Sequence, residues 1–206
     1  MGLEMDAANE ASMVVGIDSA SKHYDGLDSA IFNAAITSEG LAAIGDPFHV
    51  FEEYPLALWQ KAIDINLTGA FLFAREAGKV LKAGGGGSLI NVASLYGVVG
   101  PDHRIYDGQP FQSFPAYSAS KAGIIGLTRW LATWWGKDGV RVNCVSPGGV
   151  FNNHNDRFSA AYGNRTPMAR MADRDEITGI FIYLLSDSSR YCTGQNFVID
   201  GGFTAW

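Results

Sequence analysis

Residues 84–94 read Gly-Gly-Gly-Gly-Ser-Leu-Ile-Asn-Val-Ala-Ser. Four successive glycines end a helix, and the apolar run Ser88–Ala93 that follows them is typical of a short buried strand. Helical periodicity covers Trp59–Val80 before the glycines, and it returns in Ala116–Trp135 after a proline-punctuated loop. A strand enclosed by two helices in this way is the unit from which parallel sheets are built.

The same alternation extends over the rest of the chain. We predict further helices at Asn9–Tyr24 and Asp173–Leu185, and further strands at Leu27–Phe32, Val140–Val145 and Phe197–Asp200, with a weak strand candidate at Gly2–Asp6. Neither a linker nor an internal repeat interrupts this pattern. The sequence therefore predicts an α/β fold with a mainly parallel sheet, in a single domain over residues 1–206.

Composition restricts the classes of function. The 206 residues carry a net charge of −6 with a pI near 5.1, which argues against nucleic acid or an anionic membrane surface as the partner. No apolar run approaches the roughly 18 residues of a membrane span, and residues 1–6 lack the basic and apolar regions of a secretory signal. We therefore expect a cytoplasmic protein.

The cysteines and histidines give no sign of a metal site. Cys144 and Cys192 lie far apart, so both are expected as small buried apolar side chains and neither a disulfide framework nor a zinc site is indicated. No histidine stands three or four residues from another, as the positions show: His23, His49, His103 and His154. We expect no bound metal.

Tyr117 and Lys121 are four residues apart near the start of the predicted helix Ala116–Trp135, so their side chains project from one face. A tyrosine hydroxyl, with a pKa of about 10, is a poor acid or base at neutral pH. A neighbouring ammonium lowers that pKa and brings the hydroxyl toward general acid/base catalysis. Taken alone, the pair is also compatible with a solvated helix face.

Ser94 directly follows the strand Ser88–Ala93, at the edge where parallel sheets bind ligands, and its hydroxyl can stabilise negative charge on a carbonyl oxygen. Asn66 is polar within an apolar helical stretch, and by itself it is equally a hydrogen-bonded core amide. Two turns of small residues, Asn33-Ala34-Ala35 and Pro147-Gly148-Gly149-Val150, also follow predicted strands. Each admits a flat ligand, although each would also serve as an ordinary strand-to-helix turn.

Taken in order, these segments resemble the short-chain dehydrogenase/reductase family. The resemblance covers essentially the whole chain and rests on the following stretches: Leu27–Ala35, Ile65–Gly69, Ile90–Ser94, Tyr117–Lys121, Val142–Gly149, Thr193–Gln195 and Asp200–Gly202. It implies a Rossmann-like three-layer sandwich and hydride transfer between NAD(H) or NADP(H) and an alcohol/carbonyl pair. It also implies a small-molecule substrate and a homo-oligomer, either a dimer or a tetramer.

The resemblance also implies roles for the residues named above. Tyr117 is the expected general acid/base, and Ser94 polarises the substrate carbonyl. Lys121 is expected to hold the nicotinamide ribose and lower the pKa of Tyr117, while Asn66 supports a water-linked proton relay. The cofactor is expected to be lined by Asn33, Ala34, Ala35, Pro147, Gly148, Gly149 and Val150, in addition to Tyr117 and Lys121.

Two positions depart from the family pattern. Asn152 stands where the family often has a threonine that contacts the nicotinamide carboxamide, so we expect that contact in altered form. Phe32 replaces the first asparagine of the family's Asn-Asn-Ala-Gly turn, which removes part of the hydrogen bonding of that turn.

An insertion separates the expected catalytic residues. Ser94 and Tyr117 are 23 positions apart, which is wider than usual for the family, and the extra loop contains Asp102, His103, Arg104, Tyr106 and Asp107. A polar insertion beside the site indicates a hydroxyl-rich or charged substrate, or alternatively a solvent-facing or subunit-contact loop. Together with residues 149–170, the insertion resembles oxidoreductases of bacterial sugar and flagellin-glycan biosynthesis.

No Gly-x-x-x-Gly-x-Gly or Gly-x-Gly-x-x-Gly segment precedes Leu27. The resemblance begins at Gly2–Asp6, which is similar to the family's third strand, with Asp6 at the place of the acid that contacts adenine. The first two βα units, on the order of 50–60 residues, are therefore expected to be missing. These units would contain the helix start that binds pyrophosphate and the residue that selects NAD or NADP, so we expect both to be missing as well.

In the strand order 3-2-1-4-5-6, the missing strands would lie between Gly2–Asp6 and Leu27–Phe32, so that Leu27–Phe32 becomes an edge. We predict that a segment of this chain or of a neighbouring chain pairs with that edge.

Two functions stay open. One is a working NAD(P)-dependent oxidoreductase with weakened cofactor binding and a polar or sugar-like substrate. The other is a catalytically silent homologue that acts as an assembly partner through helices such as Ala116–Trp135.

Overall fold

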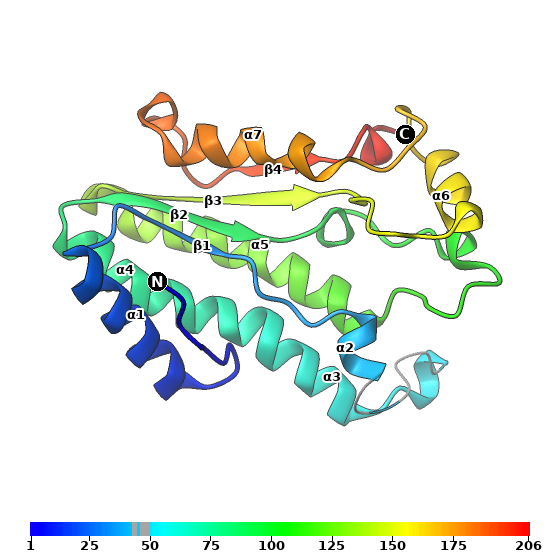
Figure 1. Cartoon of the computed structure of the whole chain (residues 1–206), viewed down its shortest axis with the longest axis horizontal. Coiled ribbons are helices and arrows are strands. Elements are labelled where there is room, and N and C mark those ends of the chain that lie inside the picture. Colours follow the sequence, from blue (N-terminus) through cyan, green and yellow to red (C-terminus); the bar gives the residue numbers. More distant parts are fainter. Residues whose placement is uncertain (43–44, 46–49) are drawn as a thin grey trace.

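Four parallel strands form the sheet of the computed structural model, which describes residues 1–42, 45 and 50–206. The strands, which neighbour one another in chain order, are β1 (Ser29–Phe32), β2 (Gly87–Val92), β3 (Val140–Pro147) and β4 (Asn196–Ile199). Every pairing is parallel, so the carboxyl ends of all the strands point toward one edge of the sheet (Figure 1). The predicted α/β class and parallel sheet are confirmed.

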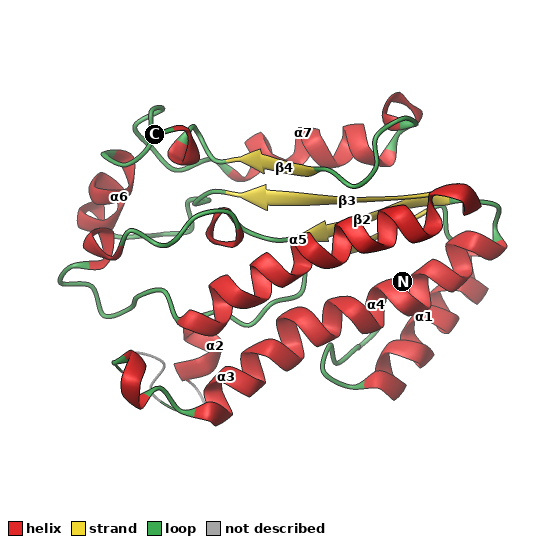
Figure 2. Ribbon diagram, turned by 180° about the vertical axis from the view of Figure 1, so that it is seen from behind, coloured by secondary structure: helices red, strands yellow, loops and turns green. Residues whose placement is uncertain are grey.

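Helices cover both faces of this sheet. One face carries α1 (Glu10–Tyr24), α4 (Gly69–Ala83) and α5 (Pro115–Trp135), and the other carries α7 (Arg174–Leu185), as the front and back views show (Figures 1 and 2). The expected three-layer, Rossmann-like arrangement is confirmed. No helix in the described part of the chain is both long and apolar enough to cross a membrane.

Three shorter helices lie toward the carboxyl edge of the sheet: α2 (Ser38–Ala42), α3 (Leu56–Ile63) and α6 (Asp156–Gly163). The periodicity from Trp59 predicted α3, which starts directly after Pro55. We did not predict α2 and α6, which have five and eight residues. Unlike α3, which continues directly into a π-helical turn and α4 and so belongs to a long periodic stretch, α2 and α6 contain too few turns for apolar periodicity to reveal them.

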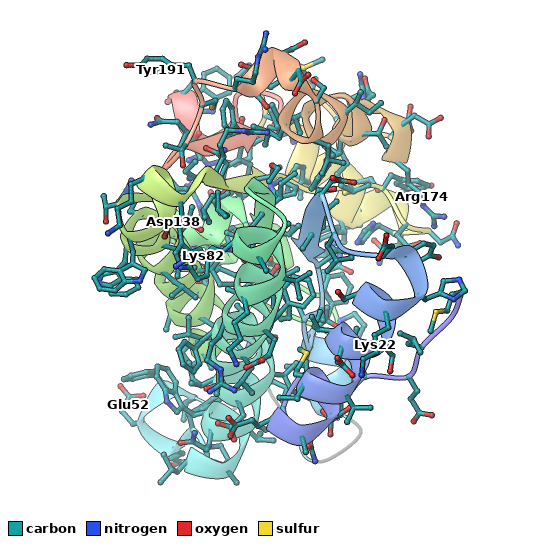
Figure 3. All side chains as sticks on the ribbon, turned by 90° about the vertical axis from the view of Figure 1, so that its left-hand side faces the viewer. Lys22, Glu52, Lys82, Asp138, Arg174 and Tyr191 are labelled. Atoms are coloured by element: carbon teal, nitrogen blue, oxygen red, sulfur yellow. The ribbon has the colours of Figure 1, made fainter. Side chains whose placement is uncertain are left out.

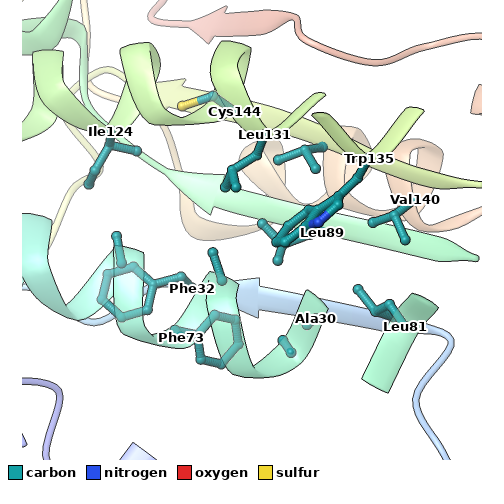
Figure 4. Packing of buried hydrophobic residues seen from close by; sticks show 14 of the residues in the cluster. Ala30, Phe32, Phe73, Leu81, Leu89, Ile124, Leu131, Trp135, Val140 and Cys144 are labelled. Carbon is teal, nitrogen blue, oxygen red and sulfur yellow. The ribbon is translucent and has the colours of Figure 1, made fainter. Parts of the chain in front are cut away.

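The buried residues explain why the run Ser88–Ala93 is apolar at nearly every position. Leu89 and Ile90 of β2 are both fully buried but point to opposite faces. Leu89 packs with α4 and α5 residues such as Phe73 and Trp135 (Figure 4), whereas Ile90 packs with Leu184 of α7. A parallel strand covered on both faces gives a continuous apolar run instead of alternation.

The cysteines have different environments. Cys144 of β3 is fully buried in the larger core cluster, as expected, while Cys192 is only partly buried, and both are free thiols. The apolar surroundings explain why burial raises the pKa of Cys144 to about 11. Of the histidines, His49 lies outside the described residues.

Gly2–Asp6 is not a strand, so this part of the prediction is wrong. Its backbone and side chains contact α1 instead. The backbone N–H of Asp6 donates to Ser12 Oγ at 2.9 Å, and the Met5 side chain packs directly over Gly16. Because these contacts hold the segment against α1, it does not reach the sheet.

The outer edge of β1 is bare in this chain. β1 pairs with β2 alone, and no other segment within residues 1–42, 45 and 50–206 reaches it. Its residue Ile31 is 38% exposed, because α7 covers β2 and β3 but not β1. The prediction that a segment of this chain pairs with Leu27–Phe32 is therefore wrong, and pairing with a neighbouring chain stays a prediction.

Candidate active site

Three polar side chains meet beside the carboxyl end of β2. Ser94 follows β2 and caps the short 3-10 turn Leu95–Gly97, while Tyr117 and Lys121 lie one turn apart on α5. The Ser94 side chain lies close enough to the Tyr117 hydroxyl to oppose the rise in its pKa. Ser94 Oγ accepts a hydrogen bond from the backbone N–H of Tyr96 at 3.2 Å. The structure thus brings together residues that are 23 positions apart in the sequence.

Lys121 is almost completely buried, with 2% of its surface exposed. Its Nζ donates to the carbonyl of Val92 at 2.9 Å and lies 5.6 Å from the centroid of the Tyr117 ring. Burial removes water from the ammonium and lowers the pKa of Lys121 to about 8, while the nearby Cys144 has a smaller, opposite effect. Lys121 therefore changes its protonation closer to neutrality than an ordinary lysine.

The pKa of Tyr117 moves in the direction opposite to the one expected. Burial raises it, and the Ser94 side chain only partly opposes this effect. The Lys121 ammonium lies over the face of the Tyr117 ring and bonds to Val92, so it does not contact the hydroxyl. Burial thus outweighs the other effects on the pKa of Tyr117, and a lowering of this pKa by Lys121 stays a prediction.

Asn66 lies in a π-helical turn, Asp64–Thr68, that separates α3 from α4. Its carboxamide is fully buried, accepts from the backbone N–H of Ile36 at 2.7 Å, and donates to Ser120 Oγ at 3.3 Å. Turns of this type interrupt helices at functional sites. Asn66 therefore joins the loop after β1 to the first turns of α5, which is the hydrogen-bonded core amide that we considered as an alternative.

Comparisons with known proteins agree with this arrangement. The family model for enoyl-(acyl carrier protein) reductase matches residues 1–204. A 3-alpha-(or 20-beta)-hydroxysteroid dehydrogenase of Mycobacterium tuberculosis is 33% identical over 203 residues, which are 98% of this chain and 70% of that protein. A short-chain dehydrogenase from Leptospira borgpetersenii with bound NAD+ superposes with a TM-score of 0.86 at 33% identity, covering 98% of this chain and 74% of the other. The chain belongs to the short-chain dehydrogenase/reductase family.

The predicted likeness to flagellin-modifying proteins is also found. Post-translational flagellin modification protein A of Campylobacter coli is 29% identical over 205 residues, which are 98% of this chain and 77% of that protein. The steroid dehydrogenase relative is somewhat more similar in sequence. Membership of the short-chain dehydrogenase/reductase family therefore leaves the substrate unspecified.

In this member of the family, the two turns expected to line the cofactor flank Ser94. Asn33, Ala34 and Ala35 follow β1 and are exposed, and residues 147–150 follow β3. A Cβ at Gly148 would lie 2.7 Å from Asp200 Cα, and a Cβ at Gly149 would lie 2.7 Å from the Tyr162 ring. The glycines are thus required for packing of the strand end, whatever ligand the turn binds.

Two predicted cofactor residues have other partners in the structure. The Asp6 carboxylate accepts from the backbone N–H of Ala8 at 2.9 Å, in the turn before α1 and outside the sheet. The Asn152 carboxamide oxygen accepts from the Arg174 guanidinium at 2.9 Å. Neither residue joins the group formed by Ser94, Tyr117 and Lys121 in the described contacts.

The charged residues of the insertion bond to one another. The Asp102 carboxylate accepts two bonds from Arg104, at 2.8 and 2.7 Å, and lies 3.2 Å from Arg165. The hydrogen bond from Arg104 is the main reason why the pKa of Asp102 falls to about 2. The Arg104 side chain is 84% exposed. Arg104 therefore lies on the outer surface of the insertion, while Asp102 is mostly covered and links the insertion to Arg165.

Aromatic residues of the insertion and α6 form the inner surface, and the sequence analysis missed them. Tyr96 and Tyr106 bond through their hydroxyls at 2.9 Å, and the rings of Tyr106 and Phe158 are 5.6 Å apart. Tyr162 hydrogen-bonds to the backbone N–H of Gly149. Two signals could have found them: Tyr96 stands two residues after Ser94, and Phe158 and Tyr162 have the four-residue spacing of one helix face.

Two pockets accompany this arrangement. The smaller, of about 240 Å³, is lined by residues that include Gly149 and Asp200, so it lies beside the predicted cofactor turn. The larger, of about 780 Å³, is lined by residues such as Asp28, Gly86 and Arg141 at the amino ends of the strands. Catalytic groups at strand carboxyl ends are the rule in parallel sheets, so the larger pocket is not the active site.

The residues present fit only part of a dinucleotide. Two small-residue turns and the Lys121 ammonium, which bonds to the Val92 carbonyl and has further protons to donate, suit the nicotinamide ribose. The described residues hold no glycine-rich strand-to-helix turn for the pyrophosphate. They also contain no group of three or more His, Cys, Asp or Glu side chains that could hold a metal ion.

Proposed function

We propose that this chain interconverts an alcohol and a carbonyl compound with NAD(H) or NADP(H). The placement of Ser94 close to the Tyr117 hydroxyl, with the Lys121 ammonium buried 5.6 Å from the centroid of the Tyr117 ring, is the observation that carries the proposal. The Ser94 hydroxyl can donate a hydrogen bond, and the Tyr117 hydroxyl can also transfer its proton. Because the two hydroxyls lie close together, both can bond to a single substrate oxygen. The 33% sequence identity to a hydroxysteroid dehydrogenase, over 98% of this chain, supports the same reaction.

The chain's own residues have separate roles in this proposal. Ser94 donates a hydrogen bond to the substrate oxygen and stabilises its negative charge as it develops. Tyr117 gives its hydroxyl proton to that oxygen during reduction and takes it back during oxidation. Lys121 stabilises the tyrosinate that forms, because its positive charge lies in a buried and poorly screened site. A bound nicotinamide supplies or accepts the hydride.

Asn66 and the cofactor turns complete the proposal. Asn66 holds the backbone of Ile36 and the side-chain hydroxyl of Ser120, and a water-linked relay from Lys121 would pass along the π-helical turn that it occupies. Residues 33–35 and 147–150 hold the nicotinamide half of the cofactor. Because no described residue suits the pyrophosphate, we expect residues 1–206 by themselves to bind NAD(H) and NADP(H) weakly.

Titration with NADH and with NADPH, followed by fluorescence and calorimetry, tests this proposal. Saturable binding in the micromolar range, with alcohol-dependent formation of NADH or NADPH, is the expected result. Binding that is absent up to millimolar concentration, together with no turnover, contradicts the proposal. An Arg141→Lys variant is a suitable control, because Arg141 lines the pocket at the opposite edge of the sheet.

A second candidate function is assembly without catalysis, and one observation favours it. Trp130 and Trp134 stack at 5.3 Å on the outer face of α5, although they are 57% and 60% exposed. Large exposed aromatic side chains are unusual unless another surface covers them. We propose that this face contacts a second copy of the chain, in a dimer or tetramer, and that the same contact serves either function.

Sedimentation velocity of the wild type and of a Trp130→Ser, Trp134→Ser double variant tests this contact. We expect an oligomer for the wild type and a monomer for the double variant, with unchanged helix content because both rings lie outside the core. An oligomer that survives both substitutions would show that another surface is used.

A further inference from the structure

Two tyrosine hydroxyls bond to each other next to the turn that carries Ser94. The hydroxyls of Tyr96 and Tyr106 are 2.9 Å apart, and each tyrosine interacts electrostatically with Tyr117. Tyr96 comes from the turn that also carries Ser94, and Tyr106 comes from the insertion. The insertion thus brings a second polar group to the position where a substrate oxygen would be bound.

Packing holds this pair in place. The Tyr106 ring contacts Phe111 at 6.1 Å and Phe158 at 5.6 Å between centroids, and Phe111 and Phe158 contact each other at 5.1 Å. These rings belong to one buried cluster that joins the insertion to α6. A hydroxyl pair on rigid rings loses little conformational freedom when it binds a ligand.

The protonation of the pair determines what it can bind. Burial raises the pKa of Tyr96 and of Tyr106, so both stay protonated at neutral pH. One hydroxyl donates to the other, which leaves one proton to donate and oxygen lone pairs to accept. A substrate hydroxyl can accept a hydrogen bond from the remaining proton and can also donate one to a lone pair of the tyrosine oxygens.

The pair itself carries no charge, because both hydroxyls stay protonated at neutral pH. On the nearby surface, Arg104 and Arg165 are paired with Asp102. A neutral hydroxyl group of the substrate, which can both donate and accept a hydrogen bond, matches the pair.

We propose that the Tyr96–Tyr106 pair binds a second hydroxyl group of a neutral substrate, while Ser94 and Tyr117 bind the oxygen that reacts. The second half of this statement rests on the proposed oxidoreductase function. The substrate is then a neutral diol or hydroxyketone, with an apolar ring or chain that packs against aromatic side chains. Of the substrate classes that the sequence of the insertion left open, this proposal favours the hydroxyl-rich one.

Ligand binding tests the pair without requiring turnover. Calorimetry compares cyclohexanol with the 1,2-, 1,3- and 1,4-cyclohexanediols, for the wild type, Tyr96→Phe and Tyr106→Phe. Tyr191→Phe is the matched control, because Tyr191 is fully exposed and projects from the top of the molecule in Figure 3. Loss of one neutral hydrogen bond corresponds to a change of about three- to tenfold in affinity.

We expect at least one diol to bind the wild type and the control about three- to tenfold more tightly than cyclohexanol, and this preference to vanish in both Phe variants. An unchanged preference in both variants, or a wild type without preference for any diol, overturns the proposal. Thermal unfolding distinguishes a purely structural pair, which would lower stability and weaken cyclohexanol and diol binding equally. Intact diol preference without any alcohol-dependent NADH or NADPH formation would instead contradict the proposed function alone.

Discussion

A buried hydrogen bond joins Asn66 to Ser120 across 54 positions of the sequence, with 3.3 Å between the Asn66 amide nitrogen and Ser120 Oγ. Ser120 Oγ donates in turn to the carbonyl of Tyr117 at 2.8 Å. The π-helical turn before α4 is thereby connected to the backbone of the residue that we expect to transfer the proton. The position of Tyr117 thus depends on a residue far from it in sequence.

Replacement of Asn66 by alanine tests this connection. Asn66→Ala leaves the buried N–H of Ile36 without its partner and removes the bond to Ser120, so we expect a loss of about 1–3 kcal/mol in the free energy of unfolding. Urea denaturation measures the loss. The control Asn164→Ala, at an exposed position, should change it by less than about 0.5 kcal/mol. Equal stability of both variants would show that the Asn66 network contributes little.

Tyr117→Phe removes only the hydroxyl that we expect to transfer the proton. Turnover should fall by about 10²- to 10⁴-fold, because general acid/base catalysis is lost while the ring stays packed. The rate of NADH or NADPH formation measures this loss, and circular dichroism checks the fold. Tyr183→Phe, at an exposed site on α7, should keep full activity. A Tyr117→Phe protein with wild-type turnover would refute the assignment.

Burial of Lys121 predicts a pH dependence of stability. Its pKa falls from an ordinary 10.5 to about 8 on folding, so between these values the unfolded chain binds more protons at this position than the native one. The free energy of unfolding therefore rises with pH in that window, and the contribution of Lys121 grows by about 1.5 kcal/mol between roughly pH 8 and 9.5.

Lys121→Met should remove this contribution, and denaturation at several pH values measures the difference between the two proteins. Lys137→Met, at an exposed position, should retain the wild-type slope. A slope that is the same in Lys121→Met and in the wild type would show that Lys121 titrates normally in the folded protein.

A pair of glycines tests how closely the Ser94 turn must approach α5. A Cβ at Gly97 would lie 2.7 Å from the carbonyl carbon of Lys121, whereas a Cβ at Gly126, in the middle of α5, meets nothing within 4 Å. We expect Gly97→Ala to destabilise the fold by about 1–3 kcal/mol. Gly126→Ala should stabilise it by about 0.5–1 kcal/mol, because alanine favours the helix. Thermal unfolding of both variants distinguishes the two effects, and a neutral Gly97→Ala would show that the turn can move away from α5.

Local patterns predicted most of the elements. The glycines Gly84–Gly87 ended α4 close to where the structure ends it, and the apolar run after them is β2. The four-residue spacing of Tyr117 and Lys121 was enough to place both on one helix face, because helical geometry depends only on neighbouring residues. Gly2–Asp6 was predicted wrongly, because its short pattern says nothing of the contacts that Met5 and Asp6 make with α1.

The sequence by itself determined the α/β alternation, the parallel sheet and the family, since periodicity, turn residues and ordered motifs are properties of the chain. Only the tertiary structure decided that Asn66 anchors α5, that burial raises the pKa of Tyr117, and that the insertion exposes Arg104 and brings Tyr106 to Tyr96. The physical reason is that hydrogen bonding and desolvation depend on which side chains packing brings together. Tyr96 and Tyr106 become neighbours only when the insertion packs on α6, and Tyr117 is brought to the end of β2 only when α5 packs on the sheet.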